Sequence, residues 1–188
     1  MPKFESLEEK QLSSQCIYDG KVLHVYKDDI ELPDGSHGIR EYCKNNGGVC
    51  VLPLTNDGEV ILVEQYRYAH RRVILEIPAG KLEAGEDRDS AVLRELREET
   101  GHICKKITYL GQTYPSPALI NEVIYIYFAE ELEYVGQELD DDEFLNCKRI
   151  PLSTLVDMVC RGEVPDAKTQ LATLKVWKLL SERQEKDS

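Results

Sequence analysis

The segment 80–101, GKLEAGEDRDSAVLRELREETG, constrains this chain most, because it combines a predicted helix with a fixed pattern of glutamates. Short polar side chains at 87–90 predict the start of the helix, and the glycine that closes the segment predicts its C-terminal cap. On such a helix Glu95, Glu98 and Glu99 are related by i, i+3 and i+4 spacings. The sequence therefore predicts three carboxylates on one helix face.

Three like charges on one helix face need compensation. Each unpaired i,i+4 pair costs a few tenths of a kcal/mol, which lysines, arginines or metal ions can offset. Carboxylate oxygens suit Mg²⁺, and also Mn²⁺, both of which bridge to phosphate oxygens. The chain as a whole carries 35 acidic and 23 basic residues, a formal net charge of −12. This charge opposes nonspecific binding to nucleic acid or to an anionic membrane, so an anionic substrate would need a cation or a local arginine cluster.

The order of predicted elements indicates one α+β, or mixed α/β, fold. A length of 188 residues matches one compact domain with a real core. Strand patterns dominate residues 17–134, and the first of them, over 17–42, form a small β unit. Residues 135–146 are too acidic for a strand and predict an acidic loop. Two helices are expected at 151–162 and 166–183.

Composition also indicates the compartment. No apolar run approaches the roughly 20 residues that span a bilayer, and the charged start MPKFESLEEK lacks the apolar middle of a signal peptide. We therefore expect a cytoplasmic protein without membrane partners. The six cysteines are far apart and form no C-x-x-C pair, which favours buried free thiols over disulfides or a zinc site.

Eight positions of the acidic segment have the spacing G-x5-E-x7-R-E-U-x-E-E-x-G: Gly80, Glu86, Arg94, Glu95, Leu96, Glu98, Glu99 and Gly101. This pattern resembles the Nudix box, the signature of hydrolases that cleave nucleoside diphosphates linked to another group. A chance match at all eight positions has a frequency of roughly a few in 10⁹, which disfavours the alternative of an ordinary solvated acidic helix face. His102 departs from the aliphatic residue that usually follows the box. The resemblance implies a Nudix fold over residues 45–188, a mixed β-sheet sandwiched between helices, after an N-terminal antiparallel β unit over residues 1–44.

The resemblance also implies residue roles. Glu95 and Glu99 would be the principal metal ligands, with assistance from Glu98. The full set of expected metal ligands is Ala79, through its backbone carbonyl, Glu95, Glu98 and Glu99. Glu86 would join this network from the preceding loop, and Arg94 would orient a glutamate through a bidentate pair.

Further segments resemble the ADP-ribose pyrophosphatase group within this family. In EQYR (64–67) Arg67 would hold a substrate phosphate or the terminal ribose, and in LEIPAGKLE (75–83) Glu76 would lie beside the metal cluster. Pro117 fills the place of a proline that the group commonly has sixteen residues after the box. Two later segments also resemble the group, as its acidic loop and its final helix start: LDDDEF (139–144) and PDAKT (165–169).

The implied reaction is attack of a metal-activated water on one phosphorus of ADP-ribose, giving AMP and ribose 5-phosphate. The catalytic base is expected from a loop. Its first candidates are the four acidic residues Asp140, Asp141, Asp142 and Glu143, among which the sequence does not choose, and the second candidate is Glu122. Solvation of the acidic run is the alternative. Ala118 departs from the glycine that usually follows the group's proline, so the loop backbone there is expected to differ.

The resemblance implies a homodimer with an exchanged N-terminal β unit, in which Arg40 reaches the partner's substrate; an exposed strand arginine is the alternative. Some tyrosines could stack on an adenine, although at strand spacing core or rim positions are commoner: Tyr66, Tyr68, Tyr114, Tyr125 and Tyr127. Hydrolysis of GDP-mannose or another nucleotide sugar is the rival within enzymes. A nucleotide-sensing domain without catalysis is the rival outside them, and the complete box disfavours it.

Overall fold

The computed structural model describes residues 6–139 and 143–187, which divide into two compact units. The N-terminal unit comprises Met1–Asn46 and Tyr114–Glu122. The larger unit comprises Gly47–Thr113 and Val123–Ser188. The chain thus leaves the larger unit once, for a short excursion, before returning to it.

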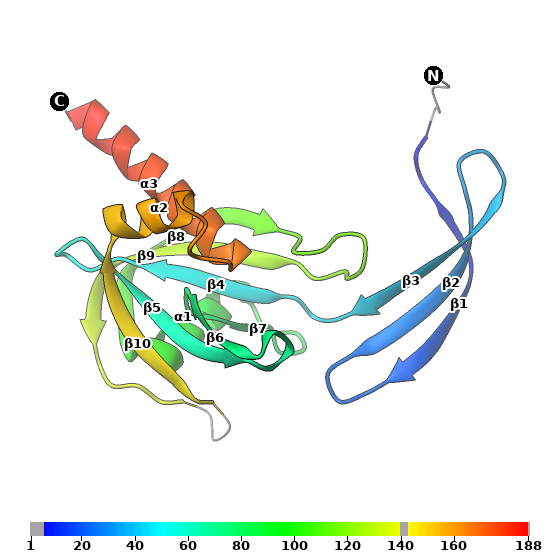
Figure 1. Ribbon diagram of the computed structural model, residues 1–188, viewed down its shortest axis with the longest axis horizontal. Helices are drawn as coiled ribbons and strands as arrows, with labels where there is room; N and C mark the ends of the chain where they lie inside the picture. The colour runs from blue at the N-terminus through cyan, green and yellow to red at the C-terminus, as the bar shows by residue number, and fades with distance from the viewer. Residues whose placement is uncertain (1–5, 140–142, 188) are drawn as a thin grey trace. The chain divides into compact units, whose positions relative to one another are not determined.

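The N-terminal unit is a three-stranded antiparallel sheet in the order β1-β2-β3 (Figure 1). Its strands are β1 (Lys10–Asp19), β2 (His24–Glu31) and β3 (His37–Lys44). The turn between β2 and β3 is closed by the Gly35 N–H, which donates to the Leu32 carbonyl over 2.8 Å. The excursion 114–122 joins this sheet through Cys43, whose N–H donates to the Leu119 carbonyl over 2.8 Å.

Two sheets organise the larger unit. The first has the order β7-β4-β9-β8, with β4 parallel to β9 and the other pairs antiparallel. Its strands are β4 (Gly48–Pro53), β7 (Ala79–Lys81), β8 (His102–Thr113) and β9 (Ile124–Tyr134). The second has the order β10-β5-β6 and is antiparallel. Its strands are β5 (Glu59–Arg67), β6 (Arg72–Glu76) and β10 (Leu145–Pro151), with a short 3₁₀ turn η1 (Tyr68–His70) between β5 and β6.

Helices cover both faces of the first sheet. They are α1 (Arg88–Thr100), α2 (Leu152–Cys160) and α3 (Ala167–Asp187). Alternate residues of β4 point to opposite faces: Val49 and Val51 pack with α1, whereas Cys50 and Leu52 join the core formed with α2 and α3. The predicted mixed α/β fold, with a mixed sheet between helices, is confirmed. None of the described helices is long and apolar enough to cross a bilayer.

The structure corrects two expectations. Residues 145 and 146, expected at the end of the acidic loop, instead begin β10, because β5 offers a full antiparallel partner from Leu145 to Pro151. The thiols are free, but Cys16, Cys147 and Cys160 are exposed, so the expectation of burial is wrong for these three.

Helix α1 has the ends that the sequence predicts. The Asp87 carboxylate caps its start by accepting from the N–H groups of Asp89 and Ser90 over 3.1 and 3.0 Å. Gly101 ends the helix at φ 72°, and its N–H donates to the Arg97 carbonyl over 2.8 Å. A Cβ at Gly101 would lie only 2.6 Å from the Tyr134 ring. A side chain there would therefore be disfavoured both by the backbone angle and by crowding.

We predict that Gly101→Ala destabilises the protein more than Gly58→Ala. Both glycines have left-handed backbone angles, φ 72° and 79°, but nothing lies within 4 Å of a Cβ at Gly58. The shared angle should cost about 1 kcal/mol at each site, and crowding should add a further ~1 kcal/mol or more at Gly101. Urea denaturation of both variants measures the difference. Equal losses would show that Gly101 is not crowded.

Candidate active site

The carboxylates of α1 lie against β7. Glu95 and Glu99 are 6% and 2% exposed, whereas Glu98 is only partly buried. The Glu95 carboxylate packs on the backbone of Gly80, where an added Cβ would lie 1.8 Å from Oε1. Only glycine leaves room for this carboxylate at position 80, which explains why a glycine stands fifteen residues before Glu95.

A single arginine braces these carboxylates. Arg94 donates from Nε and Nη2 to Glu86 over 3.0 and 3.1 Å, and from Nη1 to Glu95 and to Glu98, each over 2.8 Å. The pKa of Arg94 is raised overall, chiefly by its hydrogen bonds to Glu86 and further by its contacts with Glu98 and Glu95. Burial acts in the opposite direction but does not outweigh these contacts. This guanidinium thus orients three glutamates at once, as its planar donor geometry allows.

Burial disfavours the charged forms of Glu95 and Glu99. It raises the pKa of Glu99 to about 8, although the Ala79 N–H donates to its Oε2 over 2.9 Å. Burial likewise raises the pKa of Glu95 to about 7, because Arg94 is shared among three carboxylates and offsets only part of the penalty. The charge of Glu143 adds to both shifts. At neutral pH the two carboxylates would therefore gain from a bound cation.

The donor set fits a hard divalent cation. It offers carboxylate oxygens from α1 and the backbone of β7 at Ala79, and oxygen ligands are those that Mg²⁺ and related ions prefer. Among residues 6–139 and 143–187 no three acidic, histidine or cysteine side chains already stand at ligand positions. In this structure Arg94 holds Glu95 and Glu98. Cation binding would require these side chains to turn from the arginine.

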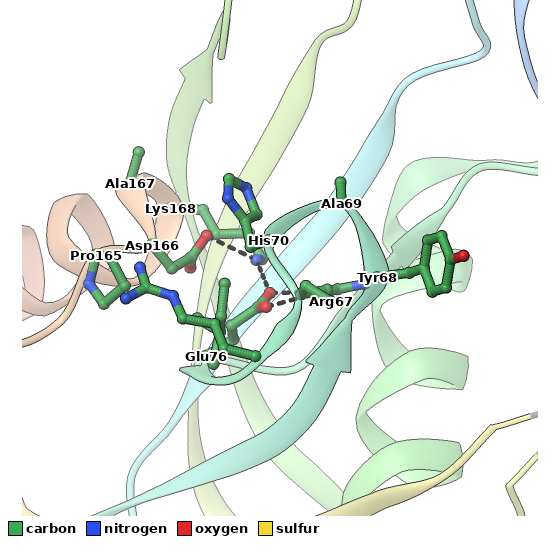
Figure 2. A pocket seen from close by; sticks show the side chains of 11 residues that line it. Arg67, Tyr68, Ala69, His70, Glu76, Pro165, Asp166, Ala167 and Lys168 are labelled. Atoms are coloured by element: carbon green, nitrogen blue, oxygen red, sulfur yellow. Dashed lines mark hydrogen bonds and ion pairs between the residues drawn. The ribbon is translucent and has the colours of Figure 1, made fainter.

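A second charged cluster lies at the ends of β5 and β6 (Figure 2). Arg67 donates to both oxygens of Glu76, from Nε over 2.7 Å and from Nη2 over 2.8 Å. Lys168, at the start of α3, binds the same carboxylate and also Asp166, the latter over 2.9 Å. These four side chains line part of a cavity of about 430 Å³, together with His70 and others. The hydrogen bonds to Glu76 raise the pKa of Arg67, and the negative charge of Glu99 raises it further. Arg67 therefore interacts electrostatically with a carboxylate of α1.

The remaining predicted site residues fall in different places. Glu143 is described and lies close enough to Glu95 and Glu99 to raise their pKa, whereas Asp141, like its neighbours 140 and 142, lies outside the described residues. Three belong to the N-terminal unit: Arg40, Pro117 and Glu122.

The residues of the N-terminal unit have partners of their own. Arg40 is bound by Glu9, with Nε 2.9 Å from the carboxylate, and Glu122 accepts from the Asn45 side chain over 2.8 Å. Arg40 and Pro117 line a cavity of about 580 Å³ within this unit.

Sequence reasoning missed Lys168 and Asp166 as members of the site. Lys168 is separated from Glu76 by 92 positions, and no local pattern links them. The only available signal is the PDAKT segment at the helix start, where Asp166 stands as an N-cap candidate.

Comparison with known families agrees with this geometry. Residues 44–173 match the model of the NUDIX domain, and residues 9–42 match that of the nucleoside diphosphate sugar hydrolase N-terminal domain. This chain belongs to the Nudix family. Nudix hydrolases in general depend on divalent metal ions, in keeping with the oxygen-rich donor set of α1 and β7.

Several Nudix relatives cover most of this chain. It is 44% identical over 170 residues to an ADP-ribose pyrophosphatase of Bacillus subtilis (strain 168), covering 89% of this chain and 92% of the relative. It is 38% identical to a methanol dehydrogenase activator of Bacillus methanolicus, covering 88% and 90%. It is 31% identical to a GDP-mannose pyrophosphatase of Yersinia pestis (strain Pestoides F), covering 78% and 80%.

A crystal structure of an ADP compounds hydrolase has the same fold. It matches with a TM-score of 0.86 at 24% identity and covers 95% of this chain and 98% of its own. The Nudix fold expected for this chain is thus confirmed.

We predict that the metal-free protein loses stability as pH rises. The pKa values of Glu95 and Glu99 rise from 4.5 to about 7 and about 8 on folding, so the folded state binds more protons than the unfolded state. Their contribution is fully present below pH 4.5 and is lost as pH rises through about 8. Thermal denaturation in EDTA at about pH 6 and about pH 8.5 measures this. Glu99→Gln should reduce the fall in Tm, and an identical fall in the variant would contradict the assignment.

Proposed function

We propose that this chain hydrolyses the diphosphate linkage of ADP-ribose, giving AMP and ribose 5-phosphate, with Mg²⁺ as its cation. The observation that carries this proposal is the pair of buried carboxylates, Glu95 and Glu99, braced against β7 with raised pKa values. The 44% identical relative named ADP-ribose pyrophosphatase supports the choice of substrate, because the match covers both units of the chain.

The side chains of the larger unit have distinct roles in this proposal. Glu95, Glu98, Glu99 and the Ala79 carbonyl would hold the cation, which when bound activates water and offsets charge on the phosphate oxygens. Arg67 binds Glu76, and its pKa is also raised by the charge of Glu99; it would donate to a phosphate oxygen of the substrate. These groups would fix the diphosphate with one phosphorus facing the attacking water.

Glu143 is the base that we favour. The negative charge of Glu143 contributes to the raised pKa values of both Glu95 and Glu99, which supports a place for its carboxylate near the proposed cation site. There its carboxylate would accept the proton of the attacking water. Asp141 and Glu122 are the alternatives, but the Glu122 carboxylate is bound by Asn45.

We also propose a homodimer in which the N-terminal unit is exchanged. One support is the number of large apolar side chains that this small unit leaves exposed: Leu12, Ile17, Tyr18, Val22, Leu23 and Ile39. In that arrangement Arg40 and Pro117 would contribute to the partner's substrate site. To bind substrate, Arg40 would have to release Glu9, its ion-pair partner in this structure.

Arg40→Ala is expected to raise KM for ADP-ribose while kcat changes little, because a residue that binds substrate and transition state equally acts on KM. Steady-state kinetics measures both constants. Lys10→Ala, an exposed cation of β1 in the same unit, is the matched control. If Arg40→Ala leaves KM at the wild-type value, the arginine does not bind substrate.

GDP-mannose is the second candidate substrate, because a relative at 31% identity is named GDP-mannose pyrophosphatase. Phosphate release after coupled phosphatase treatment compares ADP-ribose, GDP-mannose and UDP-glucose, each with Mg²⁺ and with EDTA. Metal-dependent preference for GDP-mannose would keep the reaction and change the substrate. Tight nucleotide binding without turnover would instead indicate a sensor.

Glu99→Gln is expected to reduce kcat on ADP-ribose by on the order of 10²-fold or more, because it removes a buried ligand charge with little change of shape. Glu133→Gln, at an exposed position of β9, is the control with the same chemical change. Circular dichroism verifies that both variants fold. Wild-type turnover by a folded Glu99→Gln would refute the carboxylate cluster as the catalytic centre.

A further inference from the structure

Glu76 is a buried carboxylate with two cationic partners. Its side chain is 4% exposed, and it accepts hydrogen bonds from Arg67 and from Lys168. The two cations differ in their surroundings, because the Arg67 side chain is 39% exposed whereas that of Lys168 is 11% exposed. Arg67 is thus the more accessible of the two cations that line this cavity (Figure 2).

Lys168 is fixed by the first turn of α3. Its ammonium group binds Asp166 over 2.9 Å, and the other Asp166 oxygen accepts from the Thr169 N–H over 2.9 Å. The Thr169 hydroxyl is buried and accepts from the Ile77 N–H over 2.8 Å, which ties the helix start to the residue after Glu76. Lys168 is therefore held by two carboxylates, whereas Arg67 binds only Glu76 among residues 6–139 and 143–187.

This asymmetry bears on how Arg67 can bind substrate. A buried carboxylate that loses its only cation is strongly disfavoured, so Arg67 alone would stay bound to Glu76. Burial would raise the pKa of Glu76, yet the hydrogen bonds from Arg67 and the charge of Lys168 lower it overall. Lys168 remains as a counter-ion when Arg67 turns toward an anion.

We propose that Lys168 is a positioning residue that neutralises Glu76 and thereby releases Arg67 to bind a phosphate of the substrate. The inference rests on the proposed function only where it assigns Arg67 to the diphosphate. Without the lysine charge, Arg67 would be retained by Glu76, and substrate binding would have to break that pair.

Steady-state kinetics on ADP-ribose with Mg²⁺ tests this role. Lys168→Met should raise KM by on the order of tenfold, with kcat within about twofold of wild type. Lys168→Gln keeps a hydrogen-bond donor without the charge and should raise KM as well, whereas Lys168→Arg should restore it. Lys178→Met, an exposed lysine of the same helix, is the matched control. A wild-type KM in folded Lys168→Gln would overturn the inference. A fall in kcat by the same factor as the rise in KM would overturn it as well.

Removal of Arg67 separates this inference from the proposed function. Arg67→Ala should raise KM by itself, and Lys168→Gln should add little in that background, because the group it releases is gone. If Lys168→Gln raises KM by the same factor with and without Arg67, the lysine acts independently and the inference is wrong, while the proposed function stands. If Arg67→Ala leaves KM unchanged, the proposed role of Arg67 is wrong, and the inference fails with it.

Discussion

The structure depends on keeping two carboxylates of one helix face buried side by side. Glu95 and Glu99 are nearly inaccessible, and their pKa values rise because burial disfavours their charged forms. Several features serve this arrangement: Gly80 leaves the space, Arg94 shares its charge, and β7 supplies an N–H donor at Ala79. A cation bound by these carboxylates would offset this cost and thereby stabilise the folded protein.

The site combines two charged clusters that differ in their balance of positive and negative charge. At α1, one arginine is shared by the carboxylates of Glu86, Glu95 and Glu98, so negative charge is in excess and would favour a divalent cation. At Glu76, two cations meet two carboxylates, because Lys168 is shared with Asp166, so negative charge is not in excess there and Arg67 can turn to an anion while Lys168 stays beside Glu76. A diphosphate with bound cations needs both, because its phosphate oxygens must meet metal on one side and arginine on the other.

Local patterns predicted the part of the site that lies on one helix. The capped helix and the glutamate face follow from spacings within residues 80–101, and the structure has this helix. The family resemblance implied that Arg94 orients a glutamate, and in the structure Arg94 binds three: Glu86, Glu95 and Glu98. The mixed α/β fold followed from strand and helix periods, which are likewise local.

The rest depends on partners that are distant in sequence. Strand β10 forms because β5 pairs with it, although its own residues alternate poorly. Lys168 reaches Glu76 only because α3 returns to the end of β6, and a single sequence carries no sign of that contact. The loop carboxylate could not be chosen for the same reason, since the charge of Glu143 acts on Glu95 and Glu99 through tertiary proximity alone.

The most direct test of the carboxylate cluster is Mn²⁺ binding measured by electron paramagnetic resonance, without substrate, in wild type and in Glu99→Gln. We expect wild type to bind Mn²⁺ more tightly at about pH 8.5 than at about pH 6, because protons compete for the buried carboxylates. We also expect Glu99→Gln to weaken binding by on the order of tenfold or more. Equal binding by folded wild type and Glu99→Gln at both pH values would contradict the account.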